Sequence, residues 1–270
     1  MYKKIALCLH GGISYKKVDY QDGYTNSYSN HTSIMYEDNI EKFVNFTACY
    51  KSIKKHIIDY NTDYDIDIYI HMWHQNEQMK NEIIDLYKPQ KYIFEDNKKI
   101  MKEIMLKCVS FGDKKGNGKG RLSRLYSMCK SLKMVSKDID YDLVISYRPD
   151  MLLWKDIDLN SYDRAAITKN GSTFGDFHFI MSMKNSKLFS NYYDNINKKL
   201  YDSGYHLYKN YIVKHLNLQL KGDNIEPNKH QEVLRKLKKH SLKNKSISDN
   251  ELIFFGLDKN KLLNEYDTLS

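Results

Sequence analysis

Cysteine and proline are both scarce in this chain of 270 residues, with four and three copies respectively. The cysteines are far apart and include no Cys-x-x-Cys pair, which argues against a disulfide framework or a zinc site. They lie in apolar or helical contexts, which predicts buried free thiols in a reducing compartment. No apolar run approaches the roughly 18 residues of a membrane-spanning helix. The apolar stretch at residues 5–9 is too short for a secretory signal, so we expect a cytoplasmic protein.

Two common phosphate-binding motifs are also missing. No Gly-x-Gly-x-x-Gly follows the first apolar stretch, so a dinucleotide site is not indicated. The loop at residues 112–121 is rich in glycine and lysine, but it lacks the spacing and the Ser or Thr of a P-loop. Two interpretations of this loop stay open: a basic lid that closes over a diphosphate, or a flexible connection.

The balance of charge is strongly basic. Lysine and arginine number 43 against 34 acidic residues, giving a net charge of +9. Such a surface suits phosphate-bearing partners, namely nucleotide sugars, anionic lipids or nucleic acid. Because the cations are dispersed and no known nucleic-acid-binding signature is present, we expect no specific nucleic acid. The basic stretch 229–245 suggests peripheral contact with the inner face of a membrane. A solvated helix is the alternative.

Apolar periodicity predicts strands alternating with helices. We expect strands at 4–9, 65–71, 91–95, 141–147, 164–168 and 176–182. Helices are expected at 38–57, 77–87, up to about residue 110, at 122–135 and at 188–200. This order predicts an α/β fold with a mostly parallel sheet covered by helices on both faces. The simplest division is a catalytic domain at 1–203 with a helical, basic extension at 204–270 packed on it.

Polar residues and glycines follow the first two strands. The first ends in His10, Gly11 and Gly12, and the second ends in a segment that contains His71 and Trp73. Carboxyl ends of parallel strands meet at one edge, where ligands of open α/β sheets bind. Glycines permit close backbone approach to a ligand, the histidines suit phosphate or hydroxyl groups, and the indole suits a base or sugar ring. The alternative is that His71 and Trp73 simply cap the core.

The strand at 141–147 runs directly into Arg148, Pro149 and Asp150. Arginine forks onto phosphate, and an aspartate can hold a metal ion or a sugar hydroxyl. Three Asp-x-Asp pairs also occur, at 65–67, 138–140 and 156–158, but the first two belong to the opposite edge. The third pair follows the Asp150 edge and is a geometrically possible metal site, but Asp150 is the preferred metal ligand. The alternative is a salt-bridged strand terminus.

A further carboxylate and imidazole occur together near residue 177. Asp176 and His178 are two residues apart, so they share one face of the strand predicted there. Such a pair can supply a general base or a second metal ligand. A histidine hydrogen-bonded inside the sheet is an equally good interpretation.

Taken together, these segments resemble GT-A-type glycosyltransferases, in particular the bacterial and viral enzymes that build lipopolysaccharide or capsular polysaccharide. The resemblance spans about residues 4–200 and is carried by four segments: 5–11, 67–73, 125–152 and 175–179. It implies a Rossmann-like nucleotide-sugar domain in which the ends of the first two strands hold the nucleotide. It further implies that Asp150 replaces the usual Asp-x-Asp carboxylate and that Asp176 faces the sugar.

Two departures from that family's pattern bear on the metal. The basic residue that often follows the first glycine turn is missing, and the Arg148–Asp150 segment offers one acid in place of two. Dependence on Mg²⁺ or Mn²⁺, held by Asp150, therefore stays open. We expect a cytoplasmic hexosyl- or related transferase that uses a nucleotide-sugar donor and a glycan or lipid-linked glycan acceptor. The alternatives are a nucleotidyl- or phosphotransferase and a non-catalytic nucleic-acid-binding protein.

Overall fold

The structure is a computed structural model that describes residues 3–12, 14–15, 42–43, 46–73, 77–116, 118–171, 178–225, 231–233 and 247–260. The chain forms two compact units, and each contains several segments of the sequence. The first unit comprises Met1–Gly11, Asn61–Arg148 and Asp158–Asn224, and the second comprises Gly12–Tyr60, Pro149–Ile157 and Ile225–Ser270. The predicted domain boundary at residues 203 and 204 falls inside the first unit.

The first unit is built on a seven-stranded sheet with the strand order β10-β8-β9-β6-β1-β4-β5. Its strands are β1 (Lys3–Gly11), β4 (Tyr64–Trp73), β5 (Lys91–Glu95), β6 (Leu143–Tyr147), β8 (Ile167–Lys169), β9 (His178–Met181) and β10 (Leu220–Gly222). Every strand runs parallel to its neighbours except β9, which is antiparallel to β6 and β8. The predicted mostly parallel α/β sheet is confirmed.

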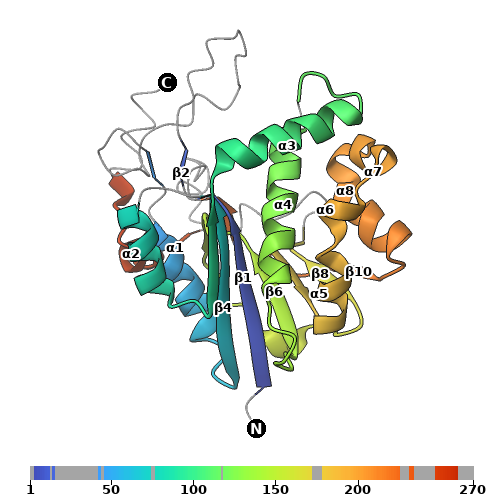
Figure 1. The fold of residues 1–270 in the computed structure, drawn as a ribbon. Coiled ribbons are helices and arrows are strands. Elements are labelled where there is room, and N and C mark those ends of the chain that lie inside the picture. The colour runs from blue at the N-terminus through green and yellow to red at the C-terminus, as the bar shows by residue number, and fades with distance from the viewer. Residues whose placement is uncertain are drawn as a thin grey trace. The chain divides into compact units, whose positions relative to one another are not determined.

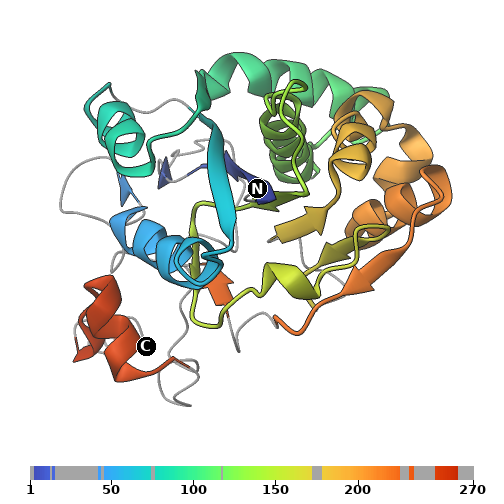
Figure 2. The ribbon, with the colours of Figure 1, turned by 90° about the horizontal axis from the view of Figure 1, so that it is seen from below.

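Helices connect these strands. The first unit contains α2 (Glu77–Tyr87), α3 (Asn97–Ser110), α4 (Lys119–Lys133), α5 (Met183–Phe189), α6 (Tyr192–Asn195), α7 (Lys198–Asp202) and α8 (Leu207–Lys209). Shorter 3-10 or π turns lie at Leu159–Ser161, Gly204–His206 and Asn210–His215. Helices α3 and α4 lie along one side of the sheet (Figure 1), and the view from below shows them together there (Figure 2).

The interior strand β1, which lies between β6 and β4, is buried along most of its length, from Ile5 to Gly11. Alternate residues of β1 serve opposite faces, and Ala6 and Cys8 join the core cluster that contains the buried residues of α4. Leu125 and Leu132 supply part of that cluster from the helix. Each fully buried leucine side chain contributes about 1.5–3 kcal/mol to the free energy of folding. The strand register that buries these side chains is therefore favoured, and it determines which side chains lie at the edge where the strands end.

The second unit is smaller in its described part. It contains β2 (Ser14–Tyr15), β3 (Lys42–Phe43), α1 (Phe46–Ile53), a π-helical turn at Lys54–Ile58, β7 (Met151–Leu153), β11 (Gln231–Val233) and α10 (Asp249–Phe255). Strands β7 and β11 are antiparallel. Ser52 Oγ exchanges hydrogen bonds with the backbone of Leu153, which fastens α1 to β7. His56 contacts the carboxylates of Asp156 and Glu251 at 2.7 and 3.4 Å.

Several predicted elements have different bounds. The helix predicted at 38–57 begins at Phe46, and Lys42–Phe43 is a strand. The helix predicted at 188–200 consists of three short ones, because Asn197 is an N-cap and the preceding Ile196 is extended. Residues 204–270 are not simply helical, since β10 and β11 come from them.

Two predictions from the composition are tested by the described residues. All four cysteines are buried and free, as expected. In the ranges that the structure describes, no helix is long and apolar enough to cross a membrane.

Candidate active site

The predicted site residues of the first unit gather at the edge where β1, β4 and β6 end. His10 and His71 are partners in the register of β1 and β4. Leu9 is paired with Tyr147, and Arg148 follows that residue directly. The sheet therefore brings the ends of three parallel strands together, as the sequence predicts for a ligand-binding edge.

His10 is the most unusual side chain at this edge. It is only 3 % exposed, and neither ring nitrogen has a hydrogen-bond partner among the described residues. Burial and the nearby charges of Arg148, His71 and Arg124 lower the pKa of His10 to about 3. At neutral pH the ring is therefore uncharged, with one N–H donor and one lone pair. Because buried polar groups are nearly always paired, this imidazole indicates a ligand.

Two guanidinium groups act on His10. Arg148 is buried, at 6 % exposed, at the end of β6, and Arg124 reaches the edge from α4. Nε of Arg124 donates to the carbonyl oxygen of Gly120 over 3.4 Å. Ser146, two residues before Arg148, is also buried, and its Oγ has no partner within the described ranges. Two fixed cations beside uncompensated polar atoms form a site suited to an anion.

A hydrogen-bonded chain below this group sets the shape of the glycine turn. Gly11 N–H donates to Ser127 Oγ at 2.8 Å. Ser127 Oγ lies 2.7 Å from Nδ1 of His71, and Nε2 of His71 lies 2.9 Å from Glu95 Oε2. Gly11 itself has a φ of +118°, which favours glycine at that position. The turn after β1 is therefore tied to α4, β4 and β5 at once.

Burial and hydrogen bonding determine the protonation states in the hydrogen-bonded chain of Ser127, His71 and Glu95. The pKa of His71 is lowered, mainly by burial, which outweighs its hydrogen bond to Glu95. A neutral His71 donates from Nε2 to Glu95, which leaves Nδ1 as an acceptor for the Ser127 hydroxyl. The same hydroxyl also donates to the carbonyl oxygen of His71 at 3.1 Å. Burial also acts to raise the pKa of Glu95, but hydrogen bonds from His71 and Tyr126 outweigh it and the pKa is lowered. Both ring nitrogens of His71 thus have protein partners, and this residue positions the turn.

Trp73 lies at the end of β4 and is 8 % exposed. Its ring stacks on Tyr126 of α4 with centroids 5.9 Å apart, and His71 meets it edge-on at 5.5 Å. Both Trp73 and Tyr126 belong to the main core cluster. One face of the indole is therefore covered by the protein itself.

His178 begins β9 beside Tyr147 of β6. Its Nε2 lies 2.6 Å from Asp223 Oδ2, which also accepts the hydroxyl of Tyr162 at 3.0 Å. The ring stacks on Tyr147, whereas the adjacent Phe179 joins the core cluster beneath α4. Alternation along the strands therefore places His178 and His10 on opposite faces of the same edge. Asp176, its predicted companion, lies outside the described residues.

Gly12 and Asp150 belong to the second unit. Gly12 directly follows β1 and is half-buried. Asp150 is 2 % exposed, and after burial its charge is the second cause that raises the pKa of Cys49. The part of the chain that the structure describes contains no group of three or more His, Cys, Asp or Glu side chains arranged to hold a metal. The donor set needed for a metal is thus not assembled there, and a metal at Asp150 stays a prediction.

The glycine- and lysine-rich loop joins α3 to α4. Asp113 accepts the N–H of Gly118 at 2.8 Å and also the hydroxyl of Tyr201. A Cβ at Gly118 would lie 2.0 Å from that hydroxyl oxygen, so no larger residue fits without movement of Tyr201. The described part of the loop is anchored to α7, and a role as a lid stays a prediction.

Sequence reasoning missed the residues that reach the edge through space. Arg124 and Ser127 are three residues apart on α4, so they share one face of that helix. Their spacing could have indicated that both residues face the sheet, because the same face of α4 also holds buried residues. Glu95 ends the strand predicted at 91–95, but nothing in the sequence pairs its carboxylate with His71. Asp223 lies where no strand was predicted, and nothing in the sequence links it to His178. Of the basic stretch 229–245, the structure describes Gln231–Val233, which is strand β11.

No family model matches this chain. No curated protein matches it either. Among solved structures, it is similar to a putative nucleotide-diphospho-sugar transferase from Desulfovibrio desulfuricans, with 14 % identity, 100 % of this chain and 97 % of that chain covered, and a TM-score of 0.41. It is also similar to mouse xyloside xylosyltransferase 1, with 10 % identity, coverage of 95 % and 94 %, and a TM-score of 0.42.

A third similar structure is a cytidylyltransferase from Leptospira borgpetersenii, with 10 % identity, coverage of 83 % and 76 %, and a TM-score of 0.38. All three TM-scores are below 0.5, so these likenesses establish neither a family nor an activity. The function proposed below rests on this chain's own residues.

Proposed function

We propose that this protein is a glycosyltransferase that moves a sugar from a nucleotide-sugar donor to a glycan or lipid-linked glycan. One observation carries the proposal. His10 is buried with both ring nitrogens unpartnered in the described structure, at the carboxyl edge of a parallel sheet and within the fields of Arg124 and Arg148. A nucleoside diphosphate is the common biological ligand that brings two charged phosphates and hydroxyl groups to such an edge.

The chemistry follows from these charges. Transfer breaks the bond between the anomeric carbon and the diphosphate oxygen, and the bonding electrons leave with the diphosphate. Arg124 and Arg148 lower the barrier by stabilising the charge that develops on that oxygen. A bond then joins the acceptor oxygen to the anomeric carbon, and the acceptor proton passes to a base. Neutral His10 adds one hydrogen bond to the donor without adding charge.

For the base, we keep the two predicted candidates, Asp176 and His178. Pairing of Nε2 with Asp223 favours the His178 tautomer that carries its lone pair on Nδ1, which is the form that accepts a proton. Asp150 is proposed to orient a sugar hydroxyl or to hold Mg²⁺ or Mn²⁺. Such an ion would offset diphosphate charge, and no step above depends on it.

Product analysis tests this proposal. The protein is incubated with UDP-, GDP-, CMP- and dTDP-sugars in the presence of a mixed glycan acceptor pool, and released nucleotides are separated by chromatography. The proposal expects a nucleoside phosphate from one donor class, with release slowed about 10- to 100-fold in Arg124→Met. Arg121→Met is the control, because the Arg121 guanidinium lies over the Tyr201 ring at 5.3 Å. Release of pyrophosphate from nucleoside triphosphates and a sugar phosphate would establish the nucleotidyltransferase alternative.

A further inference from the structure

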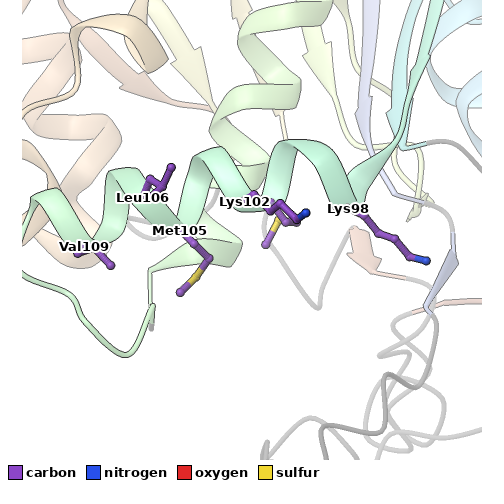
Figure 3. Close-up of a pocket in the computed structure, with 6 residues that line it drawn as sticks. Lys98, Lys102, Met105, Leu106 and Val109 are labelled. Carbon is purple, nitrogen blue, oxygen red and sulfur yellow. The ribbon is translucent and has the colours of Figure 1, made fainter.

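Helix α3 carries apolar side chains on its solvent-facing side as well as on the side that packs in the core. The solvent-facing stripe and its flanking lysines, which we name the α3 patch, line a shallow depression: Lys98, Met101, Lys102, Met105, Leu106 and Val109. These positions recur at intervals of three and four residues, which places them along one face of the helix. Figure 3 shows the labelled members following one another along α3.

The core does not need the exposed part of this stripe. Helix α3 packs into the core cluster of the first unit through Ile100, Ile104 and Cys108, which are 0–8 % exposed. Leu106 and Val109 are instead 71 % and 47 % exposed. Apolar side chains at such exposure leave much of their surface in water after folding, so the patch is available to contact something outside this chain.

The surroundings of the patch are strongly basic. From Lys98 to Lys119 the sequence holds seven lysines against two acids, Glu103 and Asp113. This short segment thus carries more than half of the net charge of +9. Lys98 and Lys102 are exposed within the patch, and Lys114 and Lys115 are exposed on the loop that follows the helix.

We propose that the α3 patch docks on an anionic lipid bilayer. Leucine, valine and methionine side chains enter the boundary between headgroups and acyl chains, while lysines extend their ammonium groups to the lipid phosphates. The clustered charge supplies attraction to an anionic leaflet. The six residues of the patch include neither arginine nor an aromatic ring, the groups with which proteins read and stack on nucleic acid.

The location of α3 adds a consequence. Asp96 caps the helix directly after Glu95, the β5 residue that binds His71, so α3 begins at the edge of the sheet that holds His10. Figure 1 shows α3 crossing the end of α4 at that level. A bilayer on the α3 patch would therefore lie beside the candidate site of the first unit. The docking itself does not depend on the proposed transfer reaction.

Vesicle co-sedimentation of the full chain tests the proposal. Vesicles of phosphatidylcholine alone are compared with vesicles containing phosphatidylglycerol, at low and at high salt. We expect binding to the anionic vesicles at low salt and its loss at high salt. Failure to bind anionic vesicles at low salt would overturn the proposal.

Matched variants assign the binding to the patch. Leu106→Asp should weaken vesicle binding about tenfold or more, and Ile253→Asp is its control because Ile253 is 72 % exposed on α10. Replacing Lys98 and Lys102 by Gln should weaken binding about 25-fold, at about fivefold per lysine. The control for the lysine variant replaces Lys137 and Lys209 by Gln, which removes the same charge from exposed positions outside the patch.

Three further results would contradict the proposal. Equal vesicle binding by the patch variants and their controls would place the membrane contact elsewhere, for example in 229–245. A concentration-dependent dimer in light scattering that Leu106→Asp dissociates, without vesicle binding, would show that a second copy covers the patch. Salt-sensitive binding to oligonucleotides in place of vesicles would assign the charge to nucleic acid.

Discussion

His71 and Ser127 are joined by a 2.7 Å contact between Nδ1 and Oγ, and the same Oγ accepts the backbone N–H of Gly11. A single hydroxyl of α4 therefore fixes both the histidine of β4 and the turn that ends β1. His10 and His71 are partners in the register of β1 and β4, but they differ in hydrogen bonding. His71 has both nitrogens satisfied, whereas His10 has neither satisfied among the described residues.

The two histidines should respond oppositely to the same substitution. His10→Leu removes a buried imidazole without partners, so the ligand-free protein should gain about 1–3 kcal/mol in its free energy of unfolding. His71→Leu removes the hydrogen-bond partner that Ser127 and Glu95 share, and should lose about 2–3 kcal/mol. Urea denaturation at neutral pH measures both. A loss of stability in His10→Leu as large as that in His71→Leu would show that His10 is paired within the fold.

The pH dependence of stability follows from the same residues. The folded-state pKa of His10 is about 3, and that of His71 is also below its unfolded value. The unfolded chain therefore binds more protons below about pH 6.5, so stability is present above that pH and falls as the pH is lowered. Each histidine contributes a slope of about 1.4 kcal/mol per pH unit until its folded pKa is reached.

Urea unfolding from pH 6.5 to 5 compares this slope in wild type and His10→Leu. The variant should lack the contribution of one histidine, about 1.4 kcal/mol per pH unit. Identical slopes in the two proteins would mean that His10 is as easily protonated in the folded state as in the unfolded one.

The tie between α4 and the glycine turn is tested with two buried serines. Ser127→Ala removes the acceptor of Gly11 N–H and the partner of His71, and should cost about 2–3 kcal/mol. Ser131→Ala is the control, because its hydroxyl donates only within α4, to the Met128 carbonyl at 2.8 Å. It should cost less than about 1 kcal/mol. Equal costs in urea denaturation would remove the special role of Ser127.

Asp223 is expected to act through His178 as a positioning residue. Asp223→Asn keeps the size of the side chain but no longer favours the proton on Nε2 of His178. If His178 is the base, kcat should fall about 100-fold or more while KM for the donor changes little, and the pH profile of kcat should shift. An unchanged kcat and profile, in a variant that melts normally, would leave the pair with a structural role only.

Long, strongly patterned elements were predictable from the sequence. Helix α2 and strand β5 have the predicted bounds, because Pro89 and polar residues separate two clear apolar patterns. The short strands β10 and β11 were not predicted. Each has three residues and forms only because a neighbouring strand, β8 or β7, offers its backbone. Their register is a tertiary property with no local pattern in the sequence.

The candidate site was likewise predictable from the sequence only in part. Chain order predicts that His10, His71 and Arg148 meet at one edge, because parallel strands end together. It does not reveal that His71 is saturated by Ser127 and Glu95 while His10 is left without partners, since α4 and β5 reach the edge from elsewhere. The contact of His178 with Asp223, 45 residues later, has the same character.

The most direct test of the account is a thermal-shift titration with UDP-, GDP-, CMP- and dTDP-sugars, each with and without Mn²⁺, in wild type and His10→Leu. A ligand that binds only the folded state raises Tm with the logarithm of its concentration over Kd. We predict that one nucleotide class raises Tm of the wild type and that this shift is largely lost in His10→Leu, although the variant starts from a higher Tm. No shift with any donor, or an equal shift in both proteins, would contradict the claim that His10 marks a nucleotide-sugar site.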